Sequence, residues 1–498
     1  MVLLTVVGIG RALVQAPSPV EVVADGVLLL LPGGLSSAAI DTLRSGAKLV
    51  LYAGVAVGTL AVGTLVGAVY ARRPTWTSTL GIAVAAWLVS GALYAAVGAG
   101  AFGAGLDGGL LWHAMSLLVE TLLFALALRV FYSLLGLRPA THVEPTTPFG
   151  SGPLVTRRDV LVGVGLSGVA AAVGALVWRA LPSEGEVILA APARGPVSLN
   201  LPPWDVPGLS PEITPTADFY TVSKNIIDPS VATDTWKLVV DGLVDRPLEL
   251  TYQQLLALPA VESALTLMCI SNSVGGDLWG NATWKGVKLA ALLQQAGVQA
   301  GAVDAVFTGA DDYKDSVAVE RALDPDALLA WEMNGQPLTR AHGAPARLLI
   351  PDIYGMKNVK WVTRITLVPN DVKGYWQTRG WDDTARYQVA SRIDSPRGRS
   401  PVKQGTLDVA GVAFAGARGI RRVEVTVDGG KSWTDAEIKP ALARNTWQLW
   451  KARVVVPPEV RDVRVRATDG VGERQTPDEA SPYPAGSTGW HTVNVFLG

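Results

Sequence analysis

Apolar residues are distributed unevenly along the 498-residue chain, and this unevenness restricts its fold more than any other feature. Four segments are each long enough to cross the roughly 30 Å hydrocarbon core of a bilayer as a helix, namely 46–71, 77–101, 109–135 and 159–181. A further short apolar stretch near the N-terminus leaves an extra span open. The sequence therefore predicts an N-terminal all-α transmembrane bundle over residues 1–182 and a water-soluble module after it.

Basic residues flank the predicted spans on alternate loops. Arg72 and Arg73 follow the first span, Arg129 and Arg138 lie at the end of the third, and Arg157 and Arg158 precede the fourth. Loops rich in Lys and Arg stay in the cytoplasm. We therefore expect a multi-pass protein of the plasma membrane, in contact with lipid, whose soluble module lies on the outer or periplasmic face.

Composition excludes several classes of protein. The formal net charge is −1 and no long Lys/Arg run is present, so no nucleic-acid partner is expected. A single cysteine excludes an intramolecular disulfide and a cysteine-rich zinc or iron–sulfur site. His113 is the only histidine within the predicted spans, and its position near a helix end favours a plain polar residue. No haem is therefore predicted in this chain.

The soluble module divides by pattern into three parts. Residues 183–215 are rich in proline and predict an extended linker. Short strands and helices over 216–385 predict a mixed α+β domain. Over 386–498 the chain consists of short alternating strands separated by Gly, Asp and Pro turns, which predicts an all-β immunoglobulin-like sandwich. The tryptophans of this last part are expected in its core and at its rim.

Cys269 ends an apolar run and begins a Ser/Asn/Gly-rich loop, in the stretch LTLMCISNSVGGDLWG. Three roles compete for it. It could be an inert buried thiol, or a nucleophile with His342 as its base, or a thiolate ligand to a transition metal whose other ligands belong to a cofactor. The residues alone rank the inert thiol first and the metal thiolate second.

The stretch TLMCISNSVGG with ATWKGVKLAALL resembles the cysteine loop of the sulfite oxidase family of molybdopterin enzymes. Residues 321–367 resemble the same family without a break, and the closing strands resemble its dimerisation domain. The likeness runs from about residue 216 to 498, and membrane-anchored bacterial members look similar. It implies a molybdenum–molybdopterin cofactor with a single pterin, and a homodimer formed through the C-terminal sandwich.

The resemblance also implies site residues. Cys269 takes the place of the metal-ligating thiolate and Tyr313 that of the active-site tyrosine. The cofactor-binding positions are occupied by Asn272, His342, Arg347, Gly355 and Lys360. Arg347 and Lys360 would hold the phosphate of the pterin, because a guanidinium grips phosphate in two places and an ammonium acts as a point charge.

The chain departs from the family where an anionic substrate would bind. Sulfite oxidases carry arginines after their cysteine, whereas this loop has Ser273 and Val274. Lys224 stands near the place of an upstream arginine, and Arg418 matches the arginine supplied by the sandwich domain. Two cations in place of four weaken the case for a divalent oxyanion.

The expected function is oxygen-atom transfer to or from a small substrate, with a separate cytochrome or quinone-linked electron carrier. One alternative is a reductase of methionine sulfoxide or another sulfoxide, and another is a non-enzymatic surface binding module. The stretch TRRDVL at 156–161 resembles a twin-arginine export signal. A cofactor assembled in the cytoplasm favours this interpretation, because the module would then have to fold before export.

Overall fold

The computed structural model describes two stretches of the chain, together with residues 54 and 58. The first stretch is 62–134 except 72, 97–100 and 104–108; the second is 204–497 except 205, 226–227, 399, 403–404, 457–459 and 461. The predicted span 159–181, the TRRDVL segment, most of the span 46–71 and most of the linker lie outside the described residues. The chain divides into two compact units, of which the first holds the long helices and the second holds the strands.

The first unit consists, where described, of apolar helices. A short helix covers Val62–Ala71. The helices α5 (Trp76–Ala96) and α6 (Gly109–Leu134) match the predicted spans 77–101 and 109–135, with the turn η1 (Ala101–Gly103) between them. Two stretches, Trp76–Ala95 and His113–Val130, are long and apolar enough to cross a membrane. The two helices pack together, and the indole of Trp87 on α5 donates to the carbonyl of Ala114 on α6 (2.8 Å).

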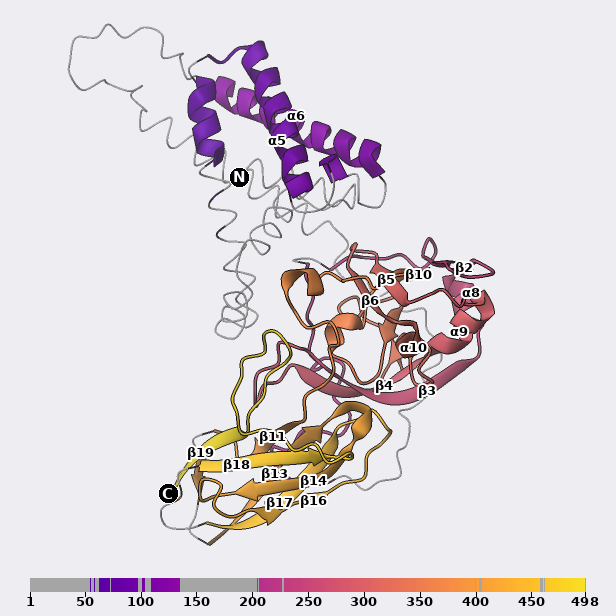
Figure 1. Cartoon of the computed structure of the whole chain (residues 1–498). Coiled ribbons are helices and arrows are strands. Elements are labelled where there is room, and N and C mark those ends of the chain that lie inside the picture. Colours follow the sequence, from indigo (N-terminus) through magenta and orange to yellow (C-terminus); the bar gives the residue numbers. More distant parts are fainter. Residues whose placement is uncertain are drawn as a thin grey trace, which may run out of the picture. The chain divides into compact units, whose positions relative to one another are not determined.

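Figure 1 shows the strands of the second unit in two groups, one drawn in magenta to orange and one in orange to yellow. The first group contains a five-stranded sheet in the order β2-β1-β10-β5-β6, in which only β1 and β10 run parallel. Its strands are β1 (Lys237–Gly242), β2 (Leu248–Thr251), β5 (Asp304–Gly309), β6 (Lys314–Ala318) and β10 (Val362–Val368).

A second sheet of the first group has the order β3-β4-β7-β8, with β9 also paired to β7. Its strands are β3 (Ala260–Met268), β4 (Trp279–Lys288), β7 (Leu328–Met333), β8 (Gln336–Pro337) and β9 (Arg347–Leu349). The helical elements are α8 (Tyr252–Leu256), α9 (Leu289–Ala296), α10 (Val319–Ala322), η2 (Gly355–Lys357) and η3 (Gln377–Arg379). Strands and short helices share one large core, so the predicted α+β domain is confirmed.

Local sequence explains where these helices begin and end. Thr251 caps α8, because its hydroxyl accepts from the backbone of Gln254 while the Gln254 side chain accepts from the backbone of Thr251. Helix α9 ends at Gly297, which adopts the left-handed conformation (φ 73°) expected of a helix-terminating glycine.

The second group of strands forms two sheets, in the orders β11-β13-β17-β16 and β12-β19-β18-β14-β15. Its elements are β11 (Ala390–Ser395), β12 (Ser400–Val402), β13 (Gly405–Phe414), η4 (Gly416–Arg418), β14 (Ile420–Thr426), β15 (Thr434–Asp435), β16 (Glu437–Ile438), β17 (Gln448–Val456), β18 (Asp462–Asp469) and β19 (His491–Leu497). Alternate residues of both sheets, including Val423, Val454 and Val465, enter a single core. The all-β prediction for the closing part is confirmed, while its immunoglobulin-like topology stays a prediction.

Strand β3 connects the two groups of strands through its second half. The backbone N–H of Thr266 donates to the carbonyl of Asn445, and the hydroxyl of Thr266 accepts from the backbone N–H of Trp447 (both 2.8 Å). The Trp447 ring packs edge-on against Trp279 at the start of β4, with 5.7 Å between ring centroids. Trp447 had been expected in the sandwich and instead packs with the core of the α+β domain. The residues that follow β3 are therefore held by both domains.

Candidate active site

Cys269 follows directly after β3 and is buried, with 7% of its surface exposed. The loop from Cys269 to Leu278, which we call the cysteine loop, closes on itself. The backbone N–H of Cys269 donates to the carbonyl of Leu278, and the side-chain oxygen of Asn272 accepts from the N–H of Leu278 (both 2.9 Å). The Asn272 side chain thus fixes the loop that presents the thiol.

The thiol lies among aromatic hydroxyls. Its sulfur is 3.0 Å from the hydroxyl of Ser271, and burial raises the pKa of the thiol although that hydrogen bond opposes the shift. Burial, with the nearby thiol contributing, also raises the pKa of Tyr220, Tyr354 and Tyr387. These three tyrosines come from three separate segments, and sequence reasoning named none of them. A polar group bound at Cys269 would therefore find hydroxyl donors around it.

Arg347 is a buried cation that lacks a carboxylate partner among the described residues. Only 5% of it is exposed; Nη1 donates to the carbonyl of His342 (3.1 Å) and Nη2 lies 3.5 Å from the carbonyl of Asn358. Its Nε has no hydrogen-bond partner in the part of the chain that the structure describes. Burial lowers the pKa of Arg347 to about 10, so the guanidinium stays charged. A buried charge of this kind calls for a bound anion.

His342 and Lys360 lie beside Arg347, as the sequence predicted. The Nε2 of His342 is 3.0 Å from the carbonyl of Thr216, and Nζ of Lys360 donates to the carbonyl of Ala341 (2.9 Å). Gly343 permits this approach, because a Cβ there would lie 2.9 Å from Cβ of Lys360 and its φ is +106°. Two cations and an imidazole thus gather around one short turn.

Gly355 begins η2 close to the cysteine strand. A Cβ at this position would lie 2.6 Å from the hydroxyl of Tyr220 and 3.4 Å from the carbonyl of Met268. The backbone of η2 can approach Tyr220 only because residue 355 has no side chain. The contact places η2 against the residue that precedes Cys269.

Tyr313 and Lys224 both lie near the ring of Tyr375. The Tyr313 hydroxyl is 2.8 Å from the carbonyl of Met356 and 3.1 Å from a carboxylate oxygen of Asp315, and its ring is 5.7 Å from that of Tyr375. Nζ of Lys224 lies 5.8 Å from the Tyr375 ring. Because Met356 follows Gly355, the Tyr313 hydroxyl reaches the same turn that packs against Tyr220.

Arg418, from η4 of the sandwich domain, is largely neutralised. Its Nε donates to Asp469 (2.6 Å), Nη1 lies 3.6 Å from a carboxylate oxygen of Asp352, and Nη2 donates to the carbonyl of Tyr387 (2.9 Å). The charge of Arg418 lowers the pKa of Tyr354 against the larger opposing effect of burial. The sandwich domain therefore supplies a cation near this tyrosine, but two carboxylates already balance it.

A small cleft opens between the cysteine loop and the sandwich domain. Val274 and Trp279 line it from one side, and Gln475 and Ser487 from the other, with Tyr354 at its wall. None of the described residues that line the cleft has a charged side chain. The indole N–H of Trp279 is buried and has no hydrogen-bond partner among the residues that the structure describes. Sequence reasoning had not singled out Trp279 as a binding residue.

Comparison with known proteins agrees with this geometry. Residues 225–376 match the model of the oxidoreductase molybdopterin binding domain, and 382–495 match the Mo-co oxidoreductase dimerisation domain. Sulfite oxidase of Gallus gallus is 31% identical over 333 residues, which cover 56% of this chain and 72% of that protein. The chain belongs to the sulfite oxidase family of molybdopterin oxidoreductases. Mo-molybdopterin is accordingly its cofactor.

Other relatives extend the comparison. Mitochondrial sulfite oxidase of Homo sapiens is 32% identical over 338 residues, covering 57% of this chain and 62% of that protein. The chain thus spans less than two thirds of the length of this family member. Nitrate reductase [NADH] 1 of Arabidopsis thaliana is 28% identical, covering 52% of this chain and 35% of that protein. The sulfane dehydrogenase SoxCD structure from Paracoccus pantotrophus is 24% identical, with a TM-score of 0.47, covering 53% of this chain and 76% of that one.

The pH dependence of stability should report on His342. Burial, together with the charges of Arg347 and Lys360, lowers the pKa of His342 to about 4. The unfolded chain therefore binds the extra proton first, and the free energy of unfolding should fall as the pH drops from about 6.5 toward 4. Burial of His491, with Arg392 nearby, lowers its pKa to about 4 and should act in the same direction.

Urea unfolding of the cofactor-free protein between pH 7 and pH 4 tests this expectation. Each imidazole should account for a loss on the order of 3 kcal/mol. His342→Gln and His491→Gln should each remove about half of the combined loss, and the double variant most of it. In the cofactor-loaded protein the His342 share should shrink, because a bound phosphate raises the pKa of that imidazole. An unchanged pH dependence in His342→Gln would contradict the prediction.

Proposed function

We propose that this protein transfers an oxygen atom to or from a small substrate, at a molybdenum ligated by Cys269. The observation that carries the proposal is the buried Arg347 guanidinium, which faces no carboxylate among the described residues and leaves its Nε without a partner. An anion held in this place would satisfy both the charge and the orphaned N–H. The pterin of the family's cofactor carries such an anion as its phosphate.

The residues of the site fit this cofactor. Arg347 and Lys360 would hold the phosphate, and His342 would contribute its Nδ1, since Nε2 is already bonded to the backbone. The thiolate of Cys269 would bind the metal, because a thiolate is a soft ligand that suits a transition metal whose other ligands belong to a cofactor. When bound, the group supplies exchange of an oxygen atom with substrate, coupled to a two-electron change.

The other residues of the site would position the reacting groups. Asn272 holds the cysteine loop closed, so the thiol is presented from a fixed backbone. Gly355 lets η2 pack against Tyr220. This packing places the carbonyl of Met356 within hydrogen-bond distance of the Tyr313 hydroxyl. Tyr313 would bond the substrate oxygen or move a proton there. Lys224 and Arg418 would lie at the margin of the substrate site, where Arg418 contributes little net charge.

Metal and pterin analysis of the purified full-length protein tests the proposal. The wild type should contain molybdenum and pterin near one per chain. Cys269→Ser should lose the thiolate-to-metal absorption, and Arg347→Met should lose most of its pterin. Lys439→Met removes a cation that is equally buried and pairs with Glu212, and it should keep both. A well-folded wild type without molybdenum would refute the proposal.

A second candidate is a substrate without charge, such as a sulfoxide, in place of sulfite. The cleft beside the cysteine loop favours it, because none of the described residues that line the cleft has a charged side chain. A divalent oxyanion that moves from water into the cleft needs cations around it. A neutral substrate oxygen needs only a hydrogen-bond donor. In this variant the reaction would remove oxygen from the substrate.

Val274→Arg tests the charge preference of the cleft. The added guanidinium should raise kcat/KM for sulfite by about tenfold or more and lower it for methionine sulfoxide, since one ion pair in a partly buried cleft is worth a few kcal/mol. Val274→Leu keeps the side chain uncharged and should shift neither preference toward sulfite. Efficient sulfite turnover by the wild type, unaltered in Val274→Arg, would exclude the uncharged-substrate variant.

We also propose that the apolar helices anchor the protein in the plasma membrane. The two stretches long enough to span it support this, as do the exposed large side chains Leu80, Leu88 and Leu111 along α5 and α6. The twin-arginine segment would direct export, and the module would act on the outer face with a separate electron carrier. The match to the dimerisation domain supports a homodimer through the C-terminal sandwich.

Membrane fractionation and reporter fusions test the anchor. The full chain should stay with membranes after an alkaline carbonate wash and should dissolve only in detergent. A periplasm-active reporter fused after residue 498 should be active, and Arg157→Lys with Arg158→Lys should trap the chain inside. Release of the full chain by the wash would contradict the proposed anchor.

A further inference from the structure

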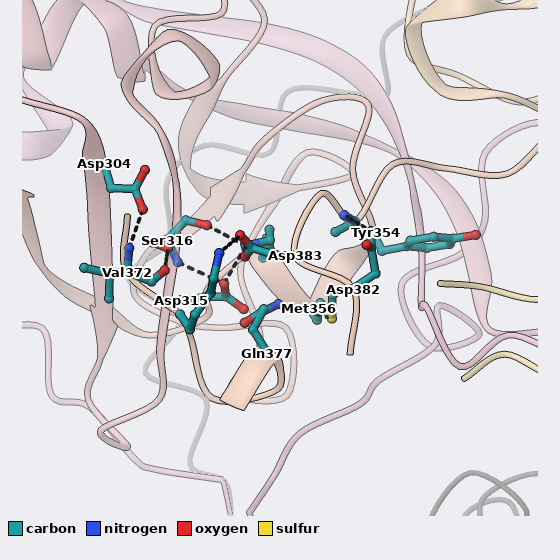
Figure 2. Close-up of polar contacts among 12 residues, drawn as sticks. Asp304, Asp315, Ser316, Tyr354, Met356, Val372, Gln377, Asp382 and Asp383 are labelled. Atoms are coloured by element: carbon teal, nitrogen blue, oxygen red, sulfur yellow. Dashed lines mark hydrogen bonds and ion pairs between the residues drawn. The ribbon is translucent and has the colours of Figure 1, made fainter. Parts of the chain in front are cut away.

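A continuous set of polar contacts leads away from the Tyr313 hydroxyl. That hydroxyl is 3.1 Å from Oδ2 of Asp315. Nζ of Lys357 donates to Oδ1 of Asp315 (3.0 Å) and to Oδ1 of Asp383 (2.9 Å). Figure 2 shows Asp315, Ser316 and Asp383 gathered around these bonds. Four side chains are thus connected in series by hydrogen bonds.

The series runs from the core to the surface. The side chain of Asp315 is completely buried and that of Lys357 is 3% exposed, whereas that of Asp383 is 35% exposed. Asp383 is also paired with Lys373 (2.6 Å), whose side chain is 47% exposed. The outer end of the series, at Asp383, therefore reaches solvent. Its inner end is the hydroxyl of Tyr313, the proposed active-site tyrosine.

Stability alone is a weak reason for this arrangement. Removing an aspartate and a lysine from water costs as much as their attraction returns, so a buried ion pair is a poor stabiliser. Asp315 also lies near Gln377, whose buried Oε1 has no hydrogen-bond partner within the described ranges. Both oxygens lie 2.6 Å from the position that a Cβ on Gly374 would occupy. A carboxyl group that carries a proton at times would suit this setting.

We propose that Asp315, Lys357 and Asp383 relay protons between the Tyr313 hydroxyl and solvent. The inference rests on the proposed function, since oxygen transfer needs such a path. Oxidising a substrate with the oxygen of water releases two protons for the two electrons that pass, one at a time, to a one-electron carrier. Reducing a substrate takes up the same two protons. Either direction therefore requires proton exchange between a buried site and water.

Each transfer balances within the series. Outward, the Tyr313 hydroxyl gives its proton to the Asp315 carboxylate and takes up the proton released at the site. Lys357 then gives a proton to the Asp383 carboxylate and receives the proton from Asp315. Asp383 finally loses its proton to water. One proton has moved outward and every group has returned to its starting state, so two rounds serve one turnover.

The charged and polar neighbours of Asp315 are Tyr313, Lys357 from η2, Ser316 from β6 and Gln377 from η3. Burial raises the pKa of Asp315, although Lys357 opposes the shift. Burial also acts to raise the pKa of Asp383, but the hydrogen bonds from Lys373 and Lys357 outweigh it and hold that pKa below its ordinary value. Protons are thus bound more firmly at the inner carboxyl than at the outer one, so the outer carboxyl readily loses its proton to water.

Asp304 lies near the series but outside it. Its carboxylate accepts the backbone N–H of Val372 (2.9 Å), as Figure 2 shows, and so holds the segment that carries Lys373. The hydroxyl of Ser316 also donates to the Val372 carbonyl. These bonds fix the outer end of the relay without taking part in the transfers.

Variants of the full-length, cofactor-loaded enzyme test the relay. The Asp315→Asn side chain has nearly the same shape as aspartate but cannot accept and release a proton. This variant should lower kcat on the order of 10²-fold. Asp315→Glu should regain part of this loss. Asp383→Ala should slow turnover less and should recover as imidazole buffer is added, because a small base can enter at the exposed end. Lys439→Met, an equally buried lysine outside the series, should keep the wild-type rate and ignore the buffer.

Infrared difference spectra on chemical reduction give a readout independent of turnover. The wild type should show a change in a protonated carboxyl signal that Asp315→Asn lacks. Wild-type rates and buffer independence in Asp383→Ala, together with an unchanged infrared signal in Asp315→Asn, would overturn the relay. If Asp315→Asn loses its molybdenum, Asp383→Ala alone decides. A wild type without molybdenum or oxygen transfer would instead refute the proposed function.

Discussion

The site depends on the way β3 and β4 are held between two domains. Thr266 bonds to the sandwich domain through both its backbone and its hydroxyl, and three residues later the chain reaches Cys269. The ladder between β3 and β4 continues to the pair Met268 and Trp279, and the cysteine loop closes directly beyond it. The thiol therefore stands at the end of a rigid hairpin. Its position relative to the sandwich is set by backbone bonds, so a shift of either domain would move the loop.

Around this hairpin the chain gathers groups that serve different purposes. Arg347 and Lys360 gather beside the imidazole of His342, and the Nε of Arg347 has no hydrogen-bond partner among the described residues, which matches an anion. The cleft beside the cysteine loop is lined, among the described residues, by side chains without charge, which matches a neutral molecule. Behind Tyr313 a third set of residues alternates acid and base out to solvent. The residues around Arg347 would thus bind the cofactor, the cleft would bind the substrate, and the series behind Tyr313 would move protons.

Much of this could be predicted from the sequence because it depends on local pattern. Alternation placed β13, β14, β17 and β18, and the sole cysteine at the end of an apolar run marked the loop. The resemblance brought His342, Arg347 and Lys360 together, and the structure does the same. The partners of Arg418 could not be predicted, because Asp469 lies 51 residues further along and Asp352 belongs to the other domain. The tyrosines around Cys269 likewise come from three segments that only the tertiary fold joins.

The buried guanidinium of Arg347, which has no carboxylate partner among the described residues, also affects the stability of the protein before its cofactor is bound. A chain without its cofactor keeps an uncompensated charge in its interior, and such a state is held less firmly than the loaded one. By mass action, binding of the anion adds its free energy to folding. The residue that we propose to bind the phosphate would thereby make the stability of the chain depend on loading with its cofactor.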